Sequence, residues 1–173
     1  MEKEDRVLSG PGALAFARQQ GFEHYNPITP QRQQEFDEKR NQQNNKGTVG
    51  CVAMDAQGNI AAATSTGGKG FELPGRVSDS ATVAGNYANQ FAGVSCTGVG
   101  EDIVNVGLAM KIVTRVTDGM SLQQATDRSF EELKQIEGFA GVIAISSNGD
   151  MYHTDSHPYM VWAAFDGRLQ VFN

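Results

Sequence analysis

The residue with the clearest chemical potential is Thr48, which follows Gly47 where a polar stretch meets a run of small and apolar residues. Cleavage between the two would leave Thr48 with both a hydroxyl group and a free α-amine. An α-amine has an ordinary pKa of about 8, which suits a general base, so nucleophile and base would share one residue. Thr48 also suits the simple role of starting a strand, because β-branched residues favour extended backbone. Taken alone, the dipeptide favours that second interpretation.

Three segments around this threonine resemble the plant-type L-asparaginase and isoaspartyl aminopeptidase family of N-terminal-nucleophile hydrolases. They are GTVGCVAMDAQGNIAAATSTGG (47–68), LPGRVSDS (73–80) and SCTGVGE (95–101). The segments occur in the family's order and near its spacing, which makes the combination far more specific than any one of them. The resemblance implies an α+β fold, a four-layer αββα sandwich, that lacks its N-terminal half in this chain.

The resemblance implies a precursor that cuts itself between Gly47 and Thr48. Gly47 then ends an α-subunit and Thr48 is the nucleophile of a β-subunit. Residues 1–47 would be the tail of the α-subunit with a polar linker, and residues 48–173 the catalytic region. Thr66 matches the family's second threonine, whose hydroxyl would orient the Thr48 hydroxyl and amine, although an isolated threonine more commonly bonds its own backbone.

Arg76 and Asp79, in GRVSDS, match the residues that would recognise the substrate. A planar guanidinium binds a carboxylate through two hydrogen bonds, and a carboxylate binds an ammonium. By resemblance, the pair holds the α-carboxylate and α-amine of an aspartyl group that is joined through its side chain. An isolated arginine and aspartate at this spacing are more typical of a solvated surface pair. Ser78 stands where the family pattern has glycine, so the loop backbone or the pocket wall is expected to differ there.

The segment TGVGE would hold the substrate from the other side. By resemblance, Thr97 and Gly98 stabilise the developing oxyanion, and such donors contribute ~3 kcal/mol each to transition-state binding. Gly100 would let the backbone pass close to the substrate amine, and Glu101 favours the plant-type group over glycosylasparaginases. A nucleotide-binding turn is the competing interpretation, but Ile103 occupies the position of the third glycine.

These assignments predict an amidohydrolase that cleaves β-aspartyl dipeptides and L-asparagine by acyl transfer to Thr48, with no metal or cofactor. The expected partners are the small-molecule substrate and the missing α-subunit portion, within a dimer of αβ heterodimers. A scaffold protein that keeps the β half of the fold, and binds an α-like partner without catalysis, is the alternative.

The elements that must position these residues follow from periodicity and turn signals. A helix is expected before Gly21 and an irregular loop over 67–80. Over 22–47 a mobile linker is favoured, with a short frayed helix as the alternative. An apolar stripe predicts one helix over 101–119, and Ser121 with Gln124 forms a capping box for a second. Strands are expected at the following ranges: 48–55, 59–66, 81–90, 91–98, 141–147, 150–155, 159–165 and 168–173. The first two are expected to pair as a hairpin, and turns at Asn148–Gly149 and Asp166–Gly167 predict two more hairpins from the last four strands.

Composition excludes several classes of protein. The chain has 173 residues, a net charge of −6 and an isoelectric point near 5.0, which argues against binding to nucleic acid. It has no apolar run long enough for a membrane helix and no secretory signal, so a cytoplasmic protein is expected.

Cys51 and Cys96 lie in apolar runs and are expected to be buried thiols. His153, Asp155 and His157 alternate like metal ligands, but a solvated loop is the favoured interpretation.

Overall fold

The computed structural model describes residues 8–39, 47–157 and 160–172, and the chain divides into two compact units, residues 1–43 and 44–173. Among the described residues, no helix is both long enough and apolar enough to cross a lipid bilayer. Each unit is described below by itself.

The first unit contains helices α1 (Gly10–Gln19) and α2 (Pro30–Lys39). α1 ends just before Gly21, as predicted, and that glycine has a positive φ of +85°. α2 corrects the expectation of a linker over its residues. Pro30 suits the first helical position, and Gln33 donates a hydrogen bond to Asp37 one turn later. The rest of the expected linker, 40–46, lies outside the described residues.

The second unit begins with a hairpin of β1 (Thr48–Met54) and β2 (Ile60–Thr66), as predicted. Its turn is built by Asp55, whose carboxylate accepts hydrogen bonds from the backbone N–H groups of Gln57 and Asn59. The antiparallel register pairs Thr48 directly with Thr66. The turn therefore brings the two threonines of the predicted site together.

A four-stranded antiparallel sheet forms the centre of this unit, in the order β3-β4-β5-β6. Two further predicted hairpins are confirmed, β5–β6 within this sheet and β7–β8 near the end of the chain. The bounds of these strands are β3 (Asn86–Ala88), β4 (Ala92–Gly98), β5 (Ala140–Ser146), β6 (Met151–Asp155), β7 (Trp162–Phe165) and β8 (Leu169–Phe172). β3 is much shorter than the strand predicted over 81–90, because residues Asp79–Ala81 form a 3₁₀ turn.

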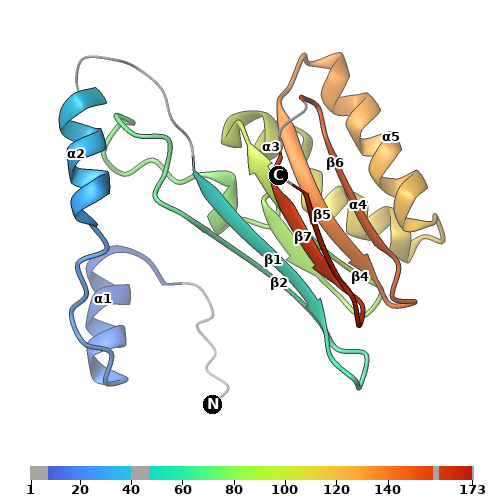
Figure 1. Ribbon diagram of the computed structural model, residues 1–173, viewed down its shortest axis with the longest axis horizontal. Helices are drawn as coiled ribbons and strands as arrows, with labels where there is room; N and C mark the ends of the chain where they lie inside the picture. Colours follow the sequence, from blue (N-terminus) through green and yellow to red (C-terminus); the bar gives the residue numbers. More distant parts are fainter. Residues whose placement is uncertain (1–7, 40–46, 158–159, 173) are drawn as a thin grey trace. The chain divides into compact units, whose positions relative to one another are not determined.

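Helices α3 (Gly100–Val106), α4 (Leu108–Thr117) and α5 (Leu122–Gln135) cover one face of this sheet (Figure 1). The core lies between them and includes Val94 and Val142 from the strands. The single helix predicted over 101–119 is wrong: Gly107, in the left-handed conformation at φ +62°, divides it. The capping box of Ser121 and Gln124 is confirmed.

The other face of the sheet carries the β1–β2 hairpin (Figure 1). The hydroxyls of Thr64 and Ser95 lie 2.7 Å apart, and a Cβ on Gly50 would approach Ser95 Oγ to 2.2 Å. Because strand residues alternate between faces, Cys51 points away from this contact and is exposed, which corrects the prediction that it is buried. Cys96 is buried as predicted, and burial raises the pKa of its thiol well above the ordinary value.

Candidate active site

The two threonines form a short hydrogen-bonded chain at the open end of the β1–β2 hairpin. The Thr48 hydroxyl donates to Thr66 Oγ1 at 3.3 Å, and the Thr66 hydroxyl donates to the carbonyl oxygen of Gly47 at 3.0 Å. The backbone N–H of Gly68 also donates to Thr66 Oγ1, at 3.1 Å. Thr66 therefore links the Thr48 hydroxyl to the carbonyl group on the other side of the Gly47–Thr48 peptide bond.

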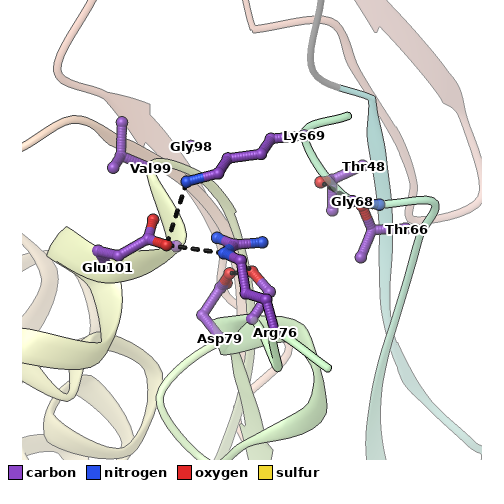
Figure 2. A pocket seen from close by; sticks show the side chains of 11 residues that line it. Thr48, Thr66, Gly68, Lys69, Arg76, Asp79, Gly98, Val99 and Glu101 are labelled. Carbon is purple, nitrogen blue, oxygen red and sulfur yellow. Dashed lines mark hydrogen bonds and ion pairs between the residues drawn. The ribbon is translucent and has the colours of Figure 1, made fainter. Parts of the chain in front are cut away.

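Arg76 and Asp79 lie together in the same pocket, on the loop that follows β2 (Figure 2). The Asp79 side chain is buried, with 4 % of the residue exposed, and its Oδ1 accepts a hydrogen bond from Ser78 Oγ at 2.7 Å. Ser78 Oγ in turn lies 3.5 Å from a guanidinium nitrogen of Arg76. The serine that departs from the family pattern thus bridges the two residues of the predicted clamp.

Gly98, the last residue of β4, and Gly100, the first residue of α3, are both packed so closely that a side chain would not fit, and Gly100 packs against the clamp. A Cβ on Gly100 would lie 2.4 Å from Ser78 Oγ and 2.7 Å from Asp79 Oδ1. Gly98 has φ +133°, and a Cβ there would lie 2.5 Å from the Phe139 carbonyl oxygen. Both glycines line the pocket, as the motif predicts. Thr97 is half-buried and is not among the lining residues.

A second pair of charged residues, Lys69 and Glu101, completes the pocket wall. Glu101 Oε1 accepts a hydrogen bond from Arg76 Nε at 2.7 Å and lies 3.4 Å from Lys69 Nζ. The hydrogen bond from Arg76 is the main reason why the pKa of Glu101 falls to about 2, and the same bond raises the pKa of Arg76. Glu101 is therefore ionised at neutral pH.

Sequence reasoning singled out Glu101 only as a marker of the subgroup, and it did not single out Lys69. Lys69 lies in an irregular loop, where no helical or strand periodicity predicts the direction of a side chain. The signal that was available is a cation directly after the paired glycines of ATSTGG, next to the predicted second threonine.

The predicted site residues line this pocket with two exceptions, Thr97 and Gly47, although the Gly47 carbonyl accepts a hydrogen bond from Thr66 (Figure 2). The pocket presents a pair of hydroxyl groups, a guanidinium, a buried carboxylate and tightly packed backbone. Such a set can bind a zwitterionic amino acid by its charged groups and hold its side chain near a hydroxyl nucleophile.

Of the three alternating residues, His153 and Asp155 lie in β6, so the interpretation as a solvated loop is wrong for these two, and both histidine rings contact an aromatic side chain. The rings of His153 and Trp162 have centroids 3.8 Å apart, and those of His157 and Phe139 are 4.7 Å apart. Within residues 8–39, 47–157 and 160–172, no group of three or more histidine, cysteine, aspartate or glutamate residues is arranged to hold a metal ion.

The pocket places two hydroxyl groups beside charged groups that could bind an amino acid, and comparison with known proteins shows the family to which the chain belongs. The asparaginase family model matches residues 1–171, so the chain belongs to the asparaginase family. This confirms the resemblance drawn from the three segments.

Relatives from distant organisms match most of this chain. The isoaspartyl peptidase/L-asparaginase of Synechocystis sp. is 46% identical over 180 residues, which cover 94% of this chain and 55% of the relative. The plant-type L-asparaginase of Thermococcus kodakarensis is 35% identical, over 94% of this chain and 61% of the relative. The human isoaspartyl peptidase/L-asparaginase is 42% identical, over 76% of this chain and 44% of the relative. The chain spans about half the length of the curated relatives it matches.

Proposed function

We propose that this chain is the nucleophile-bearing part of an isoaspartyl peptidase and L-asparaginase that activates itself by cleavage between Gly47 and Thr48. The observation that carries the proposal is the hydrogen-bonded chain from Thr48 through Thr66 to the Gly47 carbonyl, in one pocket with Arg76 and Asp79.

The hydrogen bonds from Thr48 to Thr66 and from Thr66 to Gly47 support a self-cleavage step. Thr48 Oγ1 attacks the carbonyl carbon of Gly47, the C–N bond breaks, and the acyl group moves from the nitrogen to the Thr48 oxygen as an ester. The Thr66 hydroxyl, 3.0 Å from the Gly47 carbonyl oxygen, stabilises the negative charge that develops there. The Thr48 hydroxyl proton passes to the nitrogen, so this shift already frees the α-amine of residue 48. Water then hydrolyses the ester, which releases residue 47 as a carboxylate and restores the Thr48 hydroxyl.

The freed amine supplies the base for substrate turnover. Arg76 binds the substrate α-carboxylate and Asp79 its α-amine, while Thr48 Oγ1 attacks the side-chain carbonyl and passes its proton to the Thr48 amine. Ammonia or an amino acid leaves, and water hydrolyses the β-aspartyl ester. Gly98 is the better-placed oxyanion donor, because it lines the pocket and Thr97 does not.

The same proposal includes the assembly expected from the family: a four-layer sandwich completed by an N-terminal half, a dimer of αβ pairs, and a cytoplasmic location. The exposed face of the β1–β2 hairpin supports the need for a covering layer. Val49, on that face, is 67 % exposed. The alternative is a chain that stays uncut and only binds an α-like partner. The exposed face of the hairpin supports this alternative as well.

The deciding experiment is the intact mass of the purified chain after incubation at neutral pH, beside assays with L-asparagine and a β-aspartyl dipeptide. We expect fragments 1–47 and 48–173 and hydrolysis of both compounds. Thr48→Ala should remain uncut and lose more than about 1,000-fold in rate, since it removes both nucleophile and base. Ser65→Ala is the matched control, because Ser65 is exposed next to Thr66 on the opposite face of β2. Hydrolysis that survives in Thr48→Ala would refute the proposed nucleophile.

A further inference from the structure

Lys69 lies at the pocket in a way that the reaction above does not use. Its side chain extends from the loop beside Gly68 across the pocket towards Glu101 (Figure 2). The Lys69 side chain is 43 % exposed, and the backbone N–H of Lys69 donates to Glu72 Oε2 at 2.9 Å, which holds the base of the side chain in place. The Lys69 side chain is therefore fixed at its base, and its ammonium group is accessible.

The two cations of the pocket differ in how firmly they are held. Arg76 is 14 % exposed and pairs with Glu101 at 2.7 Å and with Glu72 at 3.8 Å. Lys69 is more exposed, and its one contact with Glu101 spans 3.4 Å. A compact ammonium on a flexible stem can exchange one carboxylate partner for another at small cost. Lys69 is therefore the cation that can take a second substrate carboxylate once Arg76 has taken the first.

The candidate substrates differ in this second carboxylate. L-Asparagine has only the α-carboxylate that Arg76 would bind, and its leaving group is ammonia. A β-aspartyl dipeptide has the same α-carboxylate and a further one on the amino acid that leaves. With the α-groups at Arg76 and Asp79 and the scissile carbonyl at Thr48, the leaving amino acid extends out of the pocket, where Lys69 lies.

We propose that Lys69 binds the carboxylate of the leaving amino acid and thereby makes the site selective for β-aspartyl dipeptides with a free C-terminus. This inference rests on the proposed function and names the substrate class of the same pocket. The ion pair is made in both the ground state and the transition state, so it lowers KM and does not change kcat.

The test compares β-aspartyl-glycine with β-aspartyl-glycinamide, which share the scissile bond and differ only in the terminal carboxylate. The full chain is expected to show a KM about three to five times lower for the free acid, the range of a partly exposed ion pair. Lys69→Gln should abolish this ratio, Lys69→Arg should retain it, and added salt should reduce it. Lys134→Gln is the control for a lost lysine, since Lys134 is exposed in the last turn of α5.

The outcomes separate this inference from the one on which it rests. Hydrolysis of both compounds with equal KM, or a ratio that survives in Lys69→Gln, overturns the role of Lys69 and leaves the proposed function standing. Hydrolysis of neither compound overturns both. A preference for the free acid that appears in kcat alone and is lost in Lys69→Gln also overturns the role of Lys69, because a binding contact in both states acts on KM.

Discussion

Two clusters of charged side chains in the second unit have the same composition, because each places one arginine and one lysine on a single glutamate. The shared glutamates are Glu101 in the pocket and Glu132 on α5. Their cations are Arg76 with Lys69 in the first cluster and Arg115 with Lys111 in the second. In both clusters the neighbouring cations lower the pKa of the glutamate, to about 2 for Glu101. Charge composition therefore does not distinguish them.

The two clusters differ in their surroundings. The cations of the second cluster lie on α4, and Arg115 is further fixed by a 2.6 Å hydrogen bond to Ser129 Oγ within the packed interface with α5. The cations of the first come from the irregular loop after β2, beside Thr48, Gly98 and Gly100. The helix cluster completes a packed interface, whereas the pocket cluster leaves its cations facing a space that a ligand can enter. The comparison predicts that the first serves binding and the second serves stability.

The largest effect is expected from Arg76→Gln. Loss of the guanidinium leaves the substrate carboxylate without its main partner, and kcat/KM for a β-aspartyl dipeptide should fall by about 100-fold. The free energy of unfolding should fall by no more than about 1 kcal/mol, since the change removes an ion pair with the half-exposed Glu101 and no contact between helices. Steady-state rates and urea unfolding measure the two effects. Arg76→Lys should restore activity only in part, because an ammonium lacks the planar pair of donors; full activity in either variant would contradict the assignment.

The opposite pattern is expected from Arg115→Gln. This change removes hydrogen bonds to Glu132 and Ser129 inside the helix interface, so the free energy of unfolding should fall by about 1 to 2 kcal/mol. Rates with the dipeptide should stay within about twofold of the original. Arg128→Gln, on the exposed face of α5, is the control and should change stability by less than about 0.5 kcal/mol. Equal stability of Arg115→Gln and Arg128→Gln would show that the helix cluster has no structural role.

The pocket cluster was only partly predictable from the sequence. Arg76 and Asp79 were found because they belong to a short motif with fixed spacing, and the structure places both in the pocket. Thr48 and Thr66 were found in the same way, and their pairing follows from the register of one hairpin. Lys69 was missed, because its position depends on loop backbone and on Glu101, which is distant in sequence. No local pattern encodes such a contact.

The scaffold shows the same division between local and distant causes. The three predicted hairpins and the capping box at Ser121 depend on a few adjacent residues, and they are confirmed. The break at Gly107 was missed, because the apolar stripe continues through it and periodicity does not register one left-handed residue. Cys51 was misassigned because a run of small apolar residues does not reveal that only one face of β1 is covered.

The smallest effect, and the finest test of the comparison, is the response of the two glutamates to acid and salt. Each has a lowered pKa in the folded chain, so each stabilises the fold at pH values above its ordinary pKa of 4.5, and the contribution is lost as pH falls through the folded value. For Glu101 this window runs from 4.5 down to about 2. Urea unfolding over this range should show a shallower loss of stability in Glu101→Gln and in Glu132→Gln than in the original chain. Added salt should remove the difference sooner for Glu101, whose side chain is 51 % exposed, than for Glu132 at 31 %. An equal salt response would mean that the pocket holds its glutamate as tightly as the helix interface does, and the distinction between an open and a packed cluster would then fail.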